Sequence, residues 1–126
     1  MTDRPAEVPY DRRDQLAKIE EALLEGESVV ACYDGTGQGT GFIGLTSHRV
    51  ILQDKSFVGK RVALTSIPYS RISAVSIITN ASLAGAFFSS GTVAIVVGTH
   101  IYEIEMRGVE KARHVHDVVL WSLGIR

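Results

Sequence analysis

Four histidines and a single cysteine are the most distinctive of the side chains in this sequence that could ligate a metal or attack a substrate. His114 and His116 stand two residues apart in a predicted helix and therefore point to different faces, whereas residues three or four apart share a face. Cys32 lies inside an apolar run, where a free cysteine is usually buried and inert. One cysteine also excludes an intramolecular disulfide and a cysteine-based zinc site. We therefore expect no metal, no cofactor and no catalytic cysteine.

Glycines recur at every second position from Gly35 to Gly41. A dinucleotide fingerprint needs Gly-x-Gly-x-x-Gly between a strand and a helix, and a phosphate loop ends in Gly-Lys-Ser/Thr. This segment has neither pattern, and another apparent strand follows it, so it predicts a flexible or twisted β-hairpin. The sequence also lacks the common hydrolase and metalloprotease signatures. We expect a binding protein rather than an enzyme.

Segment 55–61 is a candidate for binding, because three basic residues surround an apolar tip. The apolar tip is Phe57 and Val58, and the basic residues that flank it in the sequence are Lys55, Lys60 and Arg61. Such a loop suits an anionic lipid surface, because the charges attract and the aromatic ring inserts. Each charge contributes only about 1 kcal/mol there, so one copy would bind weakly, and a ring of copies would bind more strongly. The alternative is an ordinary charged turn with the aromatic ring folded inward.

The connection 81–90 is a second candidate, because it has no charged residue and contains two adjacent phenylalanines. Its large apolar residues are Leu83, Phe87 and Phe88. Loops are normally polar because they face water, and exposed apolar patches tend to mark interfaces. We interpret the segment as a subunit contact, with a membrane contact second. The alternative is a loop that folds back on its own core.

The composition is that of an ordinary globular domain. The chain has 126 residues, of which 45% are apolar and 21% charged, enough to bury a core without disulfides or metal. Because its net charge is -1, the chain as a whole does not attract nucleic acid electrostatically, and we do not expect nucleic acid as a partner. The polar N-terminus has no signal core and no segment reaches membrane-spanning length, which predicts a cytoplasmic protein.

The elements that would position these residues follow from hydrophobic periodicity. Residues 1–12 read as a flexible lead-in, and residues 13–126 as one domain. Apolar residues at spacings of three and four predict helices over 13–25 and 109–123. Between them, short β-branched runs separated by turn residues predict seven strands, with short connections that favour antiparallel pairing. The strands are expected near 28–34, 40–46, 49–54, 61–67, 72–79, 92–98 and 101–107.

Two local motifs carry a family resemblance. In the run 41–52, a strand ends in Leu45-Thr46, turns through two residues and returns as Arg49 followed by aliphatics. Further on comes Ile67-Pro68-Tyr69. Over about residues 14–123 the chain resembles bacterial pleckstrin-homology (PH) domains and the related GRAM domains. The resemblance implies a PH-like, mainly β, barrel-like fold of seven antiparallel strands in two packed sheets, capped by the C-terminal helix. The N-terminal helix is extra to the minimal fold.

The same resemblance shapes the expected function. Eukaryotic PH domains often hold phosphoinositides with basic residues flanking the first hairpin, but residues 34–41 contain no Lys or Arg, which argues against that ligand. Some bacterial relatives build ring-like homo-oligomers. We therefore predict a non-catalytic binding or assembly module whose partner is itself or another protein. The alternative is peripheral membrane or small anionic-ligand binding through segment 55–61.

Overall fold

The computed structural model describes residues 7–36, 40–54, 63–79 and 90–124. The chain forms the two helices and seven strands that the sequence predicts. In chain order they are α1 (Arg13–Ala22), β1 (Val29–Thr36), β2 (Thr40–Thr46), β3 (Arg49–Asp54), β4 (Ala63–Pro68), the short 3-10 helix η1 (Tyr69–Arg71), β5 (Ala74–Ile78), β6 (Ser90–Val97), β7 (His100–Arg107) and α2 (Val109–Ser122). The first helix ends three residues earlier than expected, because the backbone is already extended at Leu23.

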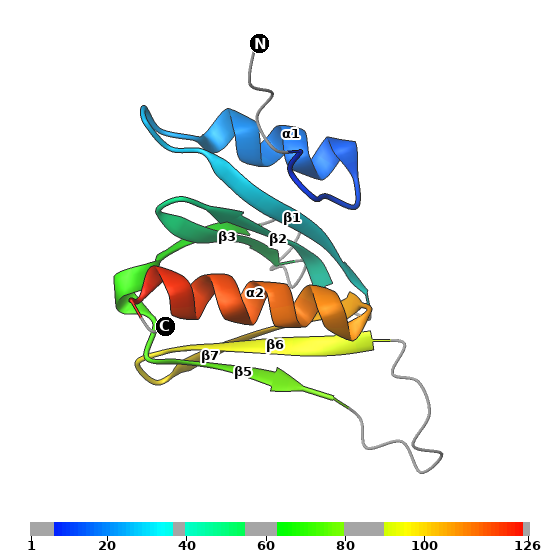
Figure 1. The fold of residues 1–126 in the computed structure, drawn as a ribbon, viewed down its shortest axis with the longest axis vertical. Coiled ribbons are helices and arrows are strands. Elements are labelled where there is room, and N and C mark those ends of the chain that lie inside the picture. Colours follow the sequence, from blue (N-terminus) through cyan, green and yellow to red (C-terminus); the bar gives the residue numbers. More distant parts are fainter. Residues whose placement is uncertain (1–6, 37–39, 55–62, 80–89, 125–126) are drawn as a thin grey trace.

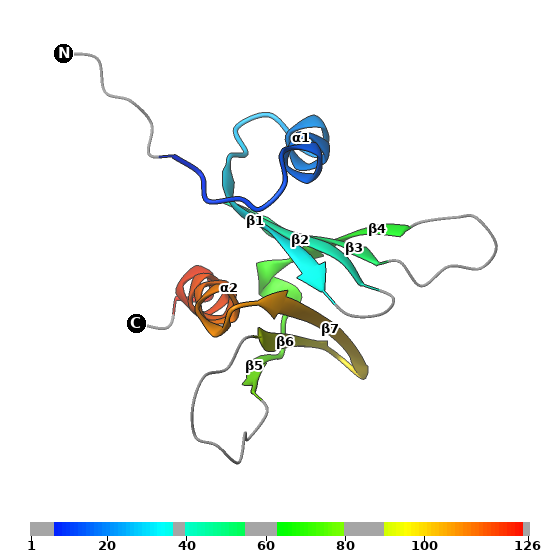
Figure 2. The same ribbon diagram turned by 90° about the vertical axis from the view of Figure 1, so that its right-hand side faces the viewer.

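The seven strands form one antiparallel sheet in the order β4-β3-β2-β1-β7-β6-β5. Its two halves meet where β1 pairs with β7; among the described residues, the pairs are Gly35 with Met106 and Thr36 with Glu105. Figure 2 shows the halves turned toward each other about this junction. The two expected sheets are therefore halves of one continuous sheet. Among the residues that the structure describes, β4 and β5 do not pair, so the sheet is bent but not closed.

The main core fills the space between the two halves and is covered on one side by α2 (Figures 1 and 2). The strands contribute alternate residues, as period-two patterning requires; in β7, Ile104 and Met106 are buried while Glu103 is exposed. The helix contributes Ala112, Val115 and Val119, all fully buried. Burying one aliphatic side chain of this size contributes about 1.5–3 kcal/mol, so α2 is an integral part of the core.

Helix α1 lies on the opposite face of the first half-sheet, over β1 and β2 (Figure 1). A second apolar cluster holds it there, made of Leu16, Ile19, Cys32, Phe42 and Ile51. The Ile19 side chain lies directly on Gly44, where an added Cβ would overlap it. The apolar stripe that predicted this helix is thus the face that packs on the sheet.

The residues just before α1 run beside β1. The Cys32 N–H donates to the carbonyl of Pro9 at 3.0 Å, and the Asp11 N–H donates to the carbonyl of Cys32 at 3.1 Å. Tyr10 forms an isolated parallel bridge with Cys32. These backbone contacts fix the entry to α1 along the edge of β1. Among the described helices, none is long and apolar enough to cross a membrane.

Candidate functional site

The candidate residues of both segments singled out from the sequence lie outside the described residues. They comprise Lys55, Phe57, Lys60 and Arg61 in the connection between β3 and β4, and Leu83, Phe87 and Phe88 in the connection between β5 and β6. The structure does describe the strands on either side of each connection. Asp54 pairs with both Thr40 and Ala63, so the first connection begins beside the start of β2. The second connection continues the chain from the end of β5.

The residues that could ligate a metal or act as nucleophiles are dispersed. His48 contacts Ser47, His100 packs on Tyr102, His114 hydrogen-bonds with Tyr33, and His116 contacts Asp117. In the part of the chain that the structure describes, no group of three His, Cys, Asp or Glu residues could hold a metal ion. Cys32 is fully buried, and burial raises the pKa of its thiol to about 12. A thiol with this pKa is protonated at neutral pH and is a poor nucleophile.

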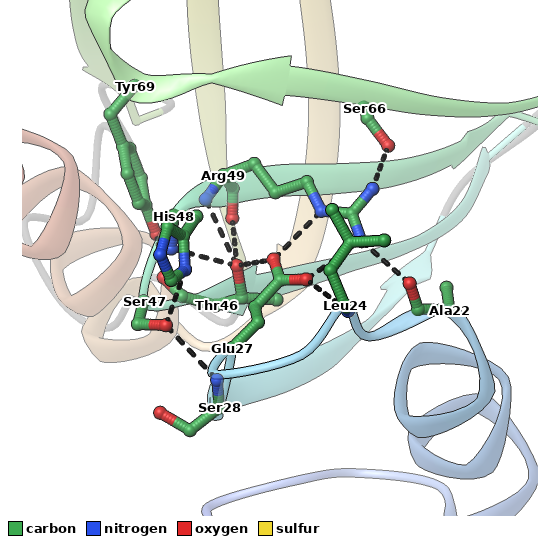
Figure 3. A network of polar contacts seen from close by, with 10 residues as sticks. All are labelled: Ala22, Leu24, Glu27, Ser28, Thr46, Ser47, His48, Arg49, Ser66 and Tyr69. Carbon is green, nitrogen blue, oxygen red and sulfur yellow. Dashed lines mark hydrogen bonds and ion pairs between the residues drawn. The ribbon is translucent and has the colours of Figure 1, made fainter.

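Glu27 and Arg49 form the centre of a buried polar network, shown in Figure 3. The Arg49 guanidinium donates to both carboxylate oxygens of Glu27, from Nε at 2.8 Å and from Nη2 at 2.9 Å. The Thr46 hydroxyl donates to Oε2 of Glu27 at 2.5 Å, and the Leu24 N–H donates to Oε1 at 2.9 Å. The Glu27 side chain is only 1% exposed. Its hydrogen bond with Arg49, opposed by burial, holds the pKa of Glu27 at about 2.

The same guanidinium joins three separate elements. It donates to the hydroxyl of Ser66 in β4 at 2.7 Å and to the carbonyl of Ala22, the last residue of α1, at 2.7 Å. A cation at a helix C-terminus is favourable, because the unpaired carbonyls there carry partial negative charge. Arg49 therefore locks the end of α1, the loop after it and the β3–β4 pair into one unit (Figure 3). Sequence reasoning identified Thr46 and Arg49 as a motif but did not identify Glu27 as the ion-pair partner of Arg49.

A pocket of about 270 Å³ lies beside this network. Leu24, which is 69% exposed, and Pro68 supply its apolar walls, and Glu27 and Arg49 lie at its polar side. The pocket is an apolar recess in which the charges of Glu27 and Arg49 are paired with each other, and its lining also includes the side chains of Glu25 and His48.

The two outer strands of the sheet each have a free edge among the described residues. Strand β5 pairs only with β6, and β4 pairs only with β3. In β5, Ala74, Ser76 and Ile78 are exposed, while Val75 and Ile77 face the core. The segment 73–79 contains no charged residue and no proline, the residues with which natural proteins usually protect a sheet edge. This edge can accept another extended chain through its backbone groups.

The comparison with known families decides what this architecture is. The family model "Bacterial PH domain" matches residues 7–118. The chain belongs to this family. Two solved structures share the fold: a pleckstrin homology domain from Shewanella amazonensis SB2B and a DUF1696 family protein with a pleckstrin-homology domain from Shewanella loihica PV-4. No curated protein matches the chain significantly.

The likeness to the two solved structures covers nearly the whole domain. The S. amazonensis domain has a TM-score of 0.64 and 21% identity, over 89% of this chain and 97% of that one. The S. loihica protein has a TM-score of 0.60 and 18% identity, over 86% of this chain and 91% of that one. At such identities the likeness is one of fold.

In this bacterial PH domain the two motifs of the sequence meet. The Tyr69 hydroxyl donates to the carbonyl of Thr46 at 2.7 Å, and Arg49 is paired with Pro68 in the β3–β4 register. Burial raises the pKa of Tyr69 to about 12. The motif residues therefore hold the turn between β2 and β3 against η1.

Proposed function

We propose that this bacterial PH domain is a non-catalytic module that assembles with copies of itself, or with another protein, through the free edge of β5. The observation that carries the proposal is an uncharged edge strand that pairs with β6 on one side and has no partner on its outer side among the described residues. The side chain of Ile78 in this strand is 45% exposed. Unprotected edges of this kind pair with other chains. The family fold generally serves binding rather than catalysis, which agrees with this role.

The connection after β5 belongs to the same proposal. It continues directly from the exposed end of the strand, and Leu83, Phe87 and Phe88 make it apolar and uncharged. An apolar segment next to an apolar edge would enlarge the buried contact, and burial of such side chains is the main favourable term in association. We assign these three residues to the partner contact.

Two geometries of self-association are available. Antiparallel pairing of two β5 strands around Ser76 gives a two-fold dimer, in which Ala74 lies opposite Ile78 of the second copy and no like charges meet. Pairing of the β5 edge with the β4 edge of the next copy is head-to-tail and gives a closed ring or an open filament. The solution mass distinguishes the two, because only the second exceeds a dimer.

Light scattering behind size-exclusion chromatography tests the proposal. We expect a mass above that of the monomer for the wild-type chain at high micromolar concentration. Ser76→Lys places a charge on the exposed face of the edge strand and should give a monomer, whereas Thr99→Lys, in the exposed β6–β7 turn, is the matched control and should not. Phe87→Ser combined with Phe88→Ser should also lower the mass. A strictly monomeric wild-type protein would show that self-association is wrong.

A further inference from the structure

A second pocket of about 270 Å³ lies on another part of the surface, where three separate parts of the chain meet. These parts are the lead-in to α1, the end of β1 and the junction between β7 and α2. The lining side chains are Asp11, Arg12, Asp34, Thr36, Arg107 and Lys111. Five of the six are charged, and both signs are present. The pocket is therefore polar, in contrast to the apolar recess beside Arg49.

One side of this pocket carries an excess of negative charge. Asp11 accepts from the Lys111 ammonium at 2.6 Å through Oδ1 and from the backbone N–H of Asp34 at 2.9 Å through Oδ2. Asp34 accepts from the side-chain amide of Gln15 at 2.6 Å through Oδ1, and its Oδ2 has no partner among the described residues. The one ammonium group beside these two carboxylates, that of Lys111, contacts Asp11 alone, so the charge of Asp34 has no cationic partner among the described residues. This acidic cluster carries about one net negative charge and offers one open acceptor.

Arg107 provides the opposite charge. Within residues 7–36, 40–54, 63–79 and 90–124, its guanidinium has no hydrogen bond or ion pair, and it is exposed. The other guanidinium of the pocket, that of Arg12, is already compensated, because it donates to both oxygens of Asp14 at 3.0 and 3.1 Å. The β1–β7 register pairs Gly35 with Met106, so Arg107 lies across the junction from Asp34. A free cation and an open carboxylate therefore line the same small pocket without contacting each other.

We propose that this pocket binds a small zwitterion of the amino-acid type, with its carboxylate on Arg107 and its ammonium on Asp34. A guanidinium presents paired donors that match a carboxylate, and an ammonium is a good donor to the open carboxylate oxygen. A zwitterion with no net charge matches a pocket whose two charge excesses cancel. A dianion such as phosphate would instead meet the repulsion of the Asp34 charge in addition to the attraction of Arg107, because Lys111 and Arg12 are already paired with Asp11 and Asp14.

Binding is tested by titrating the ¹⁵N-labelled protein with glycine, L-alanine and L-glutamine, and in parallel with acetate and inorganic phosphate. We expect the amino acids to shift the amide signals of residues around the pocket in a saturable way, and phosphate to leave them unchanged. Arg107→Ala should raise the Kd for the amino acids by about tenfold or more, because the variant lacks a charged hydrogen-bond partner for their carboxylate. Arg113→Ala removes an exposed guanidinium of α2 that does not line the pocket and should leave the Kd unchanged.

A second variant tests the role of the acidic cluster separately. Asp34→Asn keeps an acceptor for Gln15 but removes the charge, so the affinity for the amino acids should fall while the affinity for acetate should rise. Thermal melting of each variant shows that it remains folded. The proposal is wrong if no amino acid shifts the pocket signals, if Arg107→Ala leaves their Kd unchanged, or if phosphate binds the wild-type protein more tightly than the amino acids do.

Discussion

The Glu27–Arg49 pair allows a quantitative prediction about stability. The variant Glu27→Gln removes the charge of the buried carboxylate and keeps its size, leaving the Arg49 guanidinium without a counter-ion. The pKa of Glu27 is lowered from 4.5 to about 2, and each unit corresponds to about 1.4 kcal/mol, so proton linkage gives an upper value of about 3 kcal/mol. Because the Arg49 side chain is 17% exposed and can recover some hydration, we expect a loss of about 2–3 kcal/mol at neutral pH.

The pH dependence of this loss has a defined sign. A carboxyl group whose pKa is lowered by folding stabilises the folded state at pH values above its pKa in the unfolded chain. That contribution is lost as the pH falls through the folded value. The stability difference between wild type and Glu27→Gln should therefore be full at neutral pH and shrink between about pH 5 and pH 2.

Urea unfolding across this pH range, followed by circular dichroism, measures the difference. Glu25→Gln is the matched control, since Glu25 lies two residues away on the exposed loop surface and should change stability by less than about 0.5 kcal/mol. A loss for Glu27→Gln as small as that of the control, or one that stays constant from pH 7 to pH 2, would refute the reasoning about the buried pair.

Three further predictions follow from other parts of the molecule. Gly44→Val should lower the free energy of unfolding by about 1–3 kcal/mol, because the new side chain overlaps Ile19 of α1; an unchanged melting temperature would contradict this packing. Cys32 should react with a thiol reagent only in urea, since its pKa of about 12 and its burial protect it in the native protein, and rapid native labelling would show that the cluster under α1 opens. If segment 55–61 contacts anionic membranes, the charge-reversed double variant Lys60→Glu, Arg61→Glu should pellet less with phosphatidylserine liposomes than wild type does; equal pelleting would argue against that segment.

The sequence predicts most of the fold because the relevant signals are local. Alternation along residues 101–107 identifies β7, and the structure buries Ile104 and Met106 on one face as that pattern requires. The spacing of three from Leu16 to Ile19 and of four from Ile19 to Leu23 likewise identifies the face of α1 that packs on the sheet. These patterns depend only on neighbouring residues, and a solvent-facing side and a core-facing side are enough to produce them.

What the sequence does not predict depends on contacts between distant residues. Nothing near Glu27 marks it as buried, because its charge is compensated by Arg49, which is 22 residues away in the chain. The polar pocket is missed for the same reason, since Asp11 and Lys111 are 100 residues apart. The predicted contact segments 55–61 and 81–90 stay predictions, because most of their residues lie outside the described part of the chain.

The narrow junction between β1 and β7 also bears on how the chain folds. Strands β1 to β4 pair with their neighbours in sequence, and so do β5 to β7, so each half-sheet closes only short loops. The described pairs that join the halves, in contrast, close the loop between Gly35 and Met106, which carries the larger entropic penalty because it is much longer. We expect the two half-sheets to form early and the junction between them to form late. The large sequence separation of the residues at the junction would then limit the folding rate.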